Sequence, residues 1–156
     1  MSPADSGHSP LDQPLTLVWI DAREAVLAAW DRGAVRLEHV VGALPPRERS
    51  TGHVRLDPAI RHGGGQRQDK LEHRRHEREE HYLEAVAARV PPDGPVEIVG
   101  PGELRLHLAR RLQASRGGVT RTVATEPAGP LTEAQLVARL RSAVGHPARR
   151  QLARAR

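Results

Sequence analysis

The chain of 156 residues contains no cysteine, no phenylalanine and one tyrosine. The absence of cysteine excludes disulfides, thiolate metal ligands and a cysteine nucleophile. Because Trp19, Trp30 and Tyr82 are the only aromatic residues, a hydrophobic core must be built mainly from Val, Leu and Ala. Long apolar runs are also missing: none approaches the roughly 20 residues of a membrane-spanning helix. No membrane partner is therefore expected.

The start of the chain lacks the layout of a secretory signal, in which a basic segment precedes an apolar one. Residues 1–13 are polar and include Pro3 and Pro10. We therefore expect a cytoplasmic protein, and its length predicts one domain, over residues 15–146. Residues 1–14 are predicted to form a disordered arm, and residues 147–156 a basic tail.

Lysine is nearly absent as well, since Lys70 is the only lysine among 24 basic residues. With 19 acidic residues the formal net charge is +5. The guanidinium group of arginine presents a planar fork of donors that matches a phosphate. The excess of arginine, which includes Arg149 and Arg150 of the tail, favours a nucleic-acid partner.

Three segments near the start predict an antiparallel meander. Residues 15–20 (LTLVWI) form a continuous apolar run, residues 24–30 (EAVLAAW) follow, and residues 34–41 (AVRLEHVV) alternate between apolar and polar. Short turn-like breaks at residues 21–23 and 31–33 join them.

Helical and strand-like segments alternate in the rest of the chain. We predict helices over residues 69–89, 103–114 and 131–144, the last with Thr132 as a candidate cap, and strands over 96–99 and 119–125. Residues 50–68 are expected to be an irregular loop with a short strand near 53–56. The complete order predicts an α/β fold with one mixed sheet and helices on its faces. This is the order of the ribonuclease H-like architecture.

The helix predicted over residues 69–89 has an unusual first half. Residues 72–81 (EHRRHEREEH) contain no apolar side chain, and a helix that is polar on every side does not pack on a core. Apolar residues return after Tyr82, so the second half should dock on the sheet. The first half should project by roughly 15 Å. Charge pairs worth about 0.2–0.5 kcal/mol each are predicted to support it: Glu72 with Arg75, Arg74 with Glu77, and Arg75 with Glu79.

A glycine-rich loop, HGGGQR (62–67), precedes this projecting helix. Gly64 and Gly65 allow the backbone to reach positive φ and to approach another molecule closely. Gln66 then supplies an amide that both donates and accepts hydrogen bonds. A narrow tip on a stalk is suited to enter a confined site. The alternative is a solvated surface helix with a loop in front of it.

The segments HGGGQ (62–66), HYLEAVA (81–87) and VEIVGPG (96–102), with the charged helix between the first two, resemble the middle domain of the eukaryotic and archaeal class 1 peptide release factors. The segment LVWIDAREA (17–25) resembles small bacterial release-factor-like, or translational-machinery, proteins. The resemblance covers residues 15–145 approximately. It implies a ribonuclease H-like fold.

In that family the glycine-glycine-glutamine loop enters the ribosomal peptidyl-transferase centre and promotes hydrolysis of the ester between peptide and tRNA. The resemblance implies that Gly64 and Gly65 let the backbone lie against the tRNA end. It also implies that Gln66 places a water molecule while its N–H stabilises the developing charge. The expected partners are ribosomal RNA and peptidyl-tRNA, with no cofactor and no metal. The residues expected to contact RNA are His62, Arg67, Lys70, Arg74, Arg75, Arg78, Arg149 and Arg150.

Two departures from the family pattern narrow this expectation. Arg67 stands where the family usually has a small residue, and 156 residues leave no room for the decoding and GTPase-binding domains of the full factors. We therefore expect rescue of stalled ribosomes, or binding to idle ones, rather than codon-specific termination. Another translation factor is a further candidate partner.

Two other interpretations stay open. The first is a non-catalytic ribosome- or RNA-binding module of the hibernation type. The second is a metal-dependent nuclease, in which Asp21, at the end of the first predicted strand, holds metal ions together with Glu24 and Glu97. His76, Glu77 and His81 do not predict a zinc site, because their spacing is one residue longer than in the zinc peptidases.

Overall fold

The computed structural model describes residues 13–42, 64–114 and 121–145. Most of the predicted N-terminal arm, the predicted strand near residues 53–56, the basic tail, and the candidate residues His62, Arg149 and Arg150 lie outside these ranges. The elements in chain order are β1 (Leu15–Ile20), β2 (Glu24–Asp31), β3 (Ala34–Val41), α1 (Gly64–Arg89), β4 (Val96–Gly100), α2 (Leu104–Ala114), β5 (Val123–Pro127) and α3 (Glu133–Gly145). None of the helices in these ranges has both the length and the apolar character that a membrane crossing requires.

The strands form one mixed sheet in the order β3-β2-β1-β4-β5. β1, β2 and β3 are antiparallel neighbours, whereas β4 runs parallel to β1 and β5 parallel to β4. The predicted meander and the α/β class are therefore confirmed. Arg32 and Gly33 both have positive φ, 48° and 87°, at the turn between β2 and β3. Such a pair suits the right-handed twist of a two-residue hairpin.

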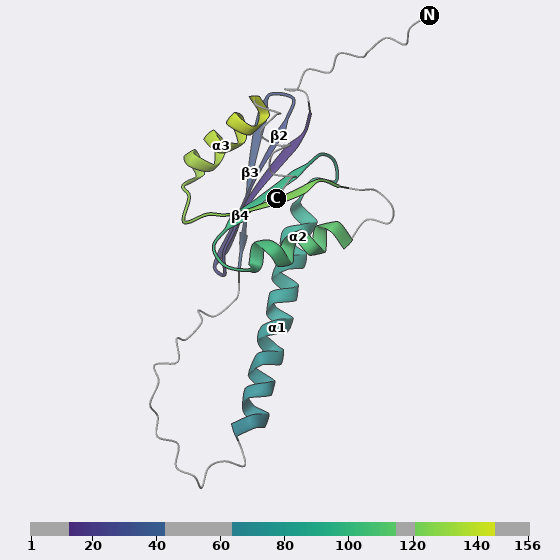
Figure 1. Cartoon of the computed structure of the whole chain (residues 1–156), viewed down its shortest axis with the longest axis vertical. Helices are drawn as coiled ribbons and strands as arrows, with labels where there is room; N and C mark the ends of the chain where they lie inside the picture. Colours follow the sequence, from purple (N-terminus) through teal and green to yellow (C-terminus); the bar gives the residue numbers. More distant parts are fainter. Residues whose placement is uncertain (1–12, 43–63, 115–120, 146–156) are drawn as a thin grey trace, which may run out of the picture.

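Helices cover both faces of the sheet (Figure 1). Val18 and Ile20 of β1 face a core that α1 and α2 complete, while Leu17 and Trp19 face a second core that α3 completes. Side chains alternate along a strand, so a central strand covered on both faces is expected to be mostly apolar. This accounts for the LTLVWI run of β1, in which every residue is buried and Thr16 alone is polar.

Two boundaries differ from the prediction by more than two residues. Helix α1 begins at Gly64 rather than at residue 69, so Gly64 and Gln66 are helical and not part of a loop. Once a helix is nucleated each added residue gains a hydrogen bond, and this continues the helix although each glycine costs about 1 kcal/mol relative to alanine. β5 begins at Val123 rather than at residue 119, because its parallel ladder starts opposite Val96 of β4.

Candidate functional site

Helix α1 leaves the body of the protein and runs outward (Figure 1). Its 26 residues correspond to about 39 Å at 1.5 Å per residue. Tyr82, Leu83 and Val86 near its C-terminal end are buried in the core with β1 and β2. Residues 66–78 are exposed except for Arg75, which is half-buried. We call residues 66–78 the stalk. It extends about 20 Å, and the predicted projection of the helix is confirmed.

Gly64, Gly65 and Gln66 form the first turn of α1, at the end farthest from the sheet (Figure 1). Gln66 is exposed to solvent. The first four N–H groups of a helix have no acceptor within the helix, and the aligned peptide dipoles place partial positive charge at this end. The tip therefore offers N–H donors and one side-chain amide to a group that approaches along the helix axis.

Contacts with α2 hold the base of the stalk. Nδ1 of His107 lies 2.5 Å from Oε1 of Glu79, and the guanidinium of Arg111 donates to Oε2 of Glu80 at 2.6 Å. The same guanidinium lies 4.0 Å from a carboxylate oxygen of Glu84. The sequence prediction did not include these contacts, because nothing in their spacing indicates that α2 packs across α1.

The three predicted charge pairs within the stalk are wrong. Glu79, the predicted partner of Arg75, instead contacts α2. Glu77 pairs with His73 at 3.3 Å and not with Arg74. Across the described ranges, the five cations of the stalk have no carboxylate within 4.0 Å; they are Arg67, Lys70, Arg74, Arg75 and Arg78. Five of the eight predicted RNA-contacting residues are thus exposed or half-buried cations on one projecting helix.

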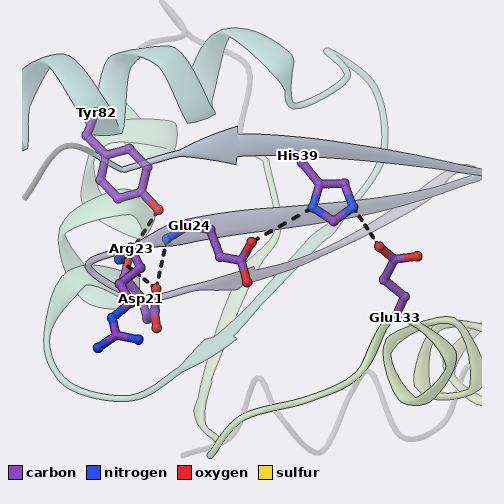
Figure 2. Close-up of polar contacts among 6 residues, drawn as sticks. All are labelled: Asp21, Arg23, Glu24, His39, Tyr82 and Glu133. Atoms are coloured by element: carbon purple, nitrogen blue, oxygen red, sulfur yellow. Dashed lines mark hydrogen bonds and ion pairs between the residues drawn. The ribbon is translucent and has the colours of Figure 1, made fainter.

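Tyr82 anchors the helix where the stalk meets the body (Figure 2). Its hydroxyl donates to the backbone carbonyl of Asp21 at 2.9 Å, at the end of β1. Burial, followed by the negative charges of Asp21 and Glu24, raises the pKa of the Tyr82 phenol well above its ordinary value. The hydroxyl therefore remains a donor, and α1 has a fixed exit point from the sheet.

The carboxylates predicted for a nuclease do not come together. Oδ1 of Asp21 accepts hydrogen bonds from the backbone N–H groups of Arg23 and Glu24, at 2.7 and 2.9 Å, which is the arrangement of a local turn (Figure 2). The carboxylate of Glu97 instead binds the guanidinium of Arg139 on α3. Among the residues described, no three His, Asp or Glu side chains form a group that would hold a metal ion.

Two groups of polar contacts on the α3 face, one around His39 and one around Arg139, were not predicted. Nε2 of His39 lies 2.8 Å from Oε1 of Glu133, the first residue of α3, and its Nδ1 lies 4.0 Å from Glu24 (Figure 2). Arg139 binds both Glu97 and Glu126 at a cavity of about 530 Å³ between α3 and the strands β4 and β5. Each contact joins distant parts of the chain, so no local pattern indicates it.

Arg139 has a structural role at this cavity. Burial lowers the pKa of the guanidinium, but hydrogen bonds and charge attraction from Glu97 and Glu126 outweigh burial, and the net pKa is raised. Two carboxylates already share the guanidinium, which is the arrangement of a structural ion pair that joins α3 to the sheet.

Comparison with known proteins adds no family to these observations. The sequence matches no protein-family model and no curated protein. The tip, the cations of the stalk and the anchor at Tyr82 therefore carry the functional proposal.

Proposed function

We propose that the protein is a ribosome-associated release or rescue factor that promotes hydrolysis of peptidyl-tRNA through Gly64, Gly65 and Gln66. The observation that carries this proposal is the position of the glycine-glycine-glutamine turn at the far end of an exposed helix. A single helix is about 10–12 Å wide with its side chains, so it can enter a site that excludes a folded domain. Action on the ribosome implies a cytoplasmic location.

The proposal includes a ribonuclease H-like topology and kinship with the middle domain of class 1 release factors. The sheet order β3-β2-β1-β4-β5 supports it, as do the antiparallel first three strands and the parallel last two. The position of the glycine-glycine-glutamine segment just before the long helix is a further point of likeness.

The chemistry is ester hydrolysis by an oriented water molecule. The oxygen of water adds to the ester carbonyl, the bond from that carbon to the tRNA oxygen breaks, and the tRNA oxygen takes up a proton released by the water. The Gln66 amide orients the water, and the N–H groups of the first helical turn stabilise the negative charge on the carbonyl oxygen. One donor of this kind is worth about 3 kcal/mol of barrier. The glycines keep side chains out of the space next to the ester.

The test is peptide release from ribosomes stalled with peptidyl-tRNA. Gln66→Ala and Gly65→Ala should each lower the release rate at least tenfold, because the first loses the orienting amide and the second adds a methyl group at the approach to the ester. Gln68→Ala is the matched control, since it removes an exposed amide two residues further along the same helix. Release that is unchanged in both Gln66→Ala and Gly65→Ala contradicts the proposal.

A second candidate is a non-catalytic module that occupies idle ribosomes. The cations of the stalk favour it, since they have no acidic partner in the described ranges and phosphate binding requires no chemistry at the tip. This candidate predicts co-sedimentation with ribosomes that weakens steeply with salt, and no peptide release by the wild-type protein. Measured release by the wild type excludes it.

A further inference from the structure

We propose that the stalk binds the RNA phosphate backbone through one face only, with Leu71 as an apolar contact in the middle of that face. This inference rests on the proposed function insofar as it takes RNA as the partner. It adds which side of the helix meets the RNA and which side is turned away. We call the six residues concerned the basic face: Arg67, Lys70, Leu71, Arg74, Arg75 and Arg78.

The helical repeat separates the charges of α1. The basic face follows the spacing i, i+3, i+4, i+7, i+8, i+11, which places its members along one side of a helix. The same spacing, begun two residues later, selects Asp69, Glu72, His73, His76, Glu77 and Glu80. Two residues correspond to about 200° of rotation. At about 100° per residue the five cations occupy an arc of about 140° around the helix. The four carboxylates occupy the other side, with Asp69 and Glu80 opposite the cations and Glu72 and Glu77 at the two borders.

Pairing within the protein leaves the basic face available. The carboxylate of Glu80 is held by Arg111 of α2, and that of Glu77 by His73 on its own side of the helix. In the described part of the chain the cations of the basic face have no acidic partner within 4.0 Å. Their arrangement in a row, unneutralised on a projecting rod, is complementary to a line of phosphates.

Leu71 distinguishes this surface from a merely solvated charged face. Its side chain is 65% exposed, and in the described ranges Leu71 and Val41 are the only large apolar residues that are mainly exposed to solvent. Leu71 lines a surface hollow together with Arg67, Lys70 and Arg74. The alkyl parts of the three cations and the leucine form an apolar floor with charged ends. A sugar-phosphate strand offers the matching pattern, with apolar ribose carbons between phosphates.

The acidic side of the helix determines how the stalk is oriented against RNA. The carboxylates of Asp69, Glu72 and Glu77 would repel phosphates. The electrostatic interaction with an RNA strand is therefore favourable on the basic face and unfavourable on the other side of the stalk. The charge separation therefore fixes how α1 is rotated about its axis against RNA, and with it the direction in which the Gln66 amide points at the tip.

The experiment compares two matched triple variants of the full chain. Arg67→Gln, Arg74→Gln and Arg78→Gln together neutralise three cations of the basic face. Asp69→Asn, Glu72→Gln and Glu77→Gln together neutralise three carboxylates of the opposite face. Affinity for a short ribosomal RNA hairpin is measured across a series of salt concentrations, and circular dichroism verifies that helix content is retained.

The basic-face triple should weaken RNA binding at least tenfold and reduce the slope of log affinity against log salt by about 2, because each phosphate contact contributes about 0.7–0.9 to that slope. The opposite-face triple should bind at least as well as wild type, with the same slope. Leu71→Ala should weaken binding severalfold without a change of slope. Equal effects of the two triples overturn the inference, as does tighter binding to a polyglutamate peptide than to the RNA.

The inference and the proposed function fail separately. If the basic-face triple binds RNA as wild type does while Gln66→Ala still lowers release at least tenfold, the inference is wrong and the release proposal stands. If the triple loses RNA binding while the wild type releases no peptide, the basic face is supported and the release proposal is wrong.

Discussion

Tyr82 gives the sharpest test of how the stalk is anchored, because it is the only tyrosine in the chain. Its ring is 4% exposed and its hydroxyl donates to the Asp21 carbonyl at 2.9 Å. Tyr82→Phe keeps the ring and removes this hydrogen bond, so we expect a loss of about 1 kcal/mol in the free energy of unfolding. For a chain of this length that corresponds to a fall of about 2–4 °C in Tm.

The same residue predicts a specific response to alkaline pH. Burial and the charges of Asp21 and Glu24 raise the pKa of Tyr82 in the folded protein, whereas in the unfolded chain the phenol titrates near pH 10. Above pH 10 the unfolded state therefore releases its proton while the folded state retains it. Because only the unfolded state releases this proton, rising pH favours unfolding, and the free energy of unfolding falls by up to about 1.4 kcal/mol per pH unit. Below pH 10 this contribution is fully present.

Two measurements follow this behaviour. Phenolate absorbance reports Tyr82 alone, and in the folded protein it should rise well above pH 10. Chemical denaturation at a series of pH values should show the alkaline loss of stability in wild type and in Lys70→Arg, a control that removes the lone lysine. Tyr82→Phe should lack this component. A phenolate that forms near pH 10 in the folded protein contradicts the raised pKa of Tyr82. An alkaline loss of stability that is equal in Tyr82→Phe and wild type contradicts its assignment to this residue.

Three further predictions concern the fold that supports the stalk. Gly100→Ala should cost more than about 3 kcal/mol, because at φ 152° its Cβ would lie 2.1 Å from a backbone carbonyl oxygen of β1. Gly102 is also at positive φ but has open space around it, so Gly102→Ala should lower the free energy of unfolding by only about 1–2 kcal/mol. Equal losses for Gly100→Ala and Gly102→Ala in urea denaturation contradict the steric explanation. Arg139→Met leaves the half-buried Glu97 without its partner and should lower the free energy of unfolding by about 1–2 kcal/mol. The loss should be smaller when Glu97→Gln is present in the same chain, and a double-mutant cycle that shows no such coupling contradicts the structural role of this ion pair. Thr132→Ala removes the hydroxyl that accepts a hydrogen bond from the N–H of Gln135 at the start of α3, and it should lower the free energy of unfolding by about 1 kcal/mol. Thr132→Ser keeps a hydroxyl and should be close to neutral in the same assay. A loss in Thr132→Ser as large as that in Thr132→Ala contradicts the capping role.

The local pattern of apolar and polar residues was sufficient to predict the bounds of the strands in which that pattern is clear. β1 and β3 have the predicted bounds, because the mostly apolar run of β1 and the alternation of apolar and polar residues in β3 are both local signals. The start of β5 was missed, since its register is set by pairing with β4 and not by its own residues. The start of α1 was missed because glycine favours a loop locally, whereas the helix behind it extends through Gly64.

The candidate site was predictable where it depends on composition and unpredictable where it depends on packing. The polar run of residues 72–81 indicated the projecting helix, and the return of apolar residues after Tyr82 indicated its anchor. The partners of Glu79 and Glu80 were not visible in the sequence, because His107 and Arg111 follow on a separate helix. For the same reason the spacing suggested pairs inside the stalk that do not form. It also did not reveal that the stalk cations have no carboxylate partner among the residues that the structure describes.

The central claim is that the Gln66 amide at the tip takes part in ester hydrolysis. The most direct test is single-turnover peptide release from peptidyl-tRNA ribosomes, with the factor concentration varied to saturation, for wild type, Gln66→Ala and Gln68→Ala. Gln66→Ala should lower the rate at saturation at least tenfold while the half-saturating concentration stays the same, and Gln68→Ala should match wild type. Equal saturating rates for all three proteins contradict this role of Gln66.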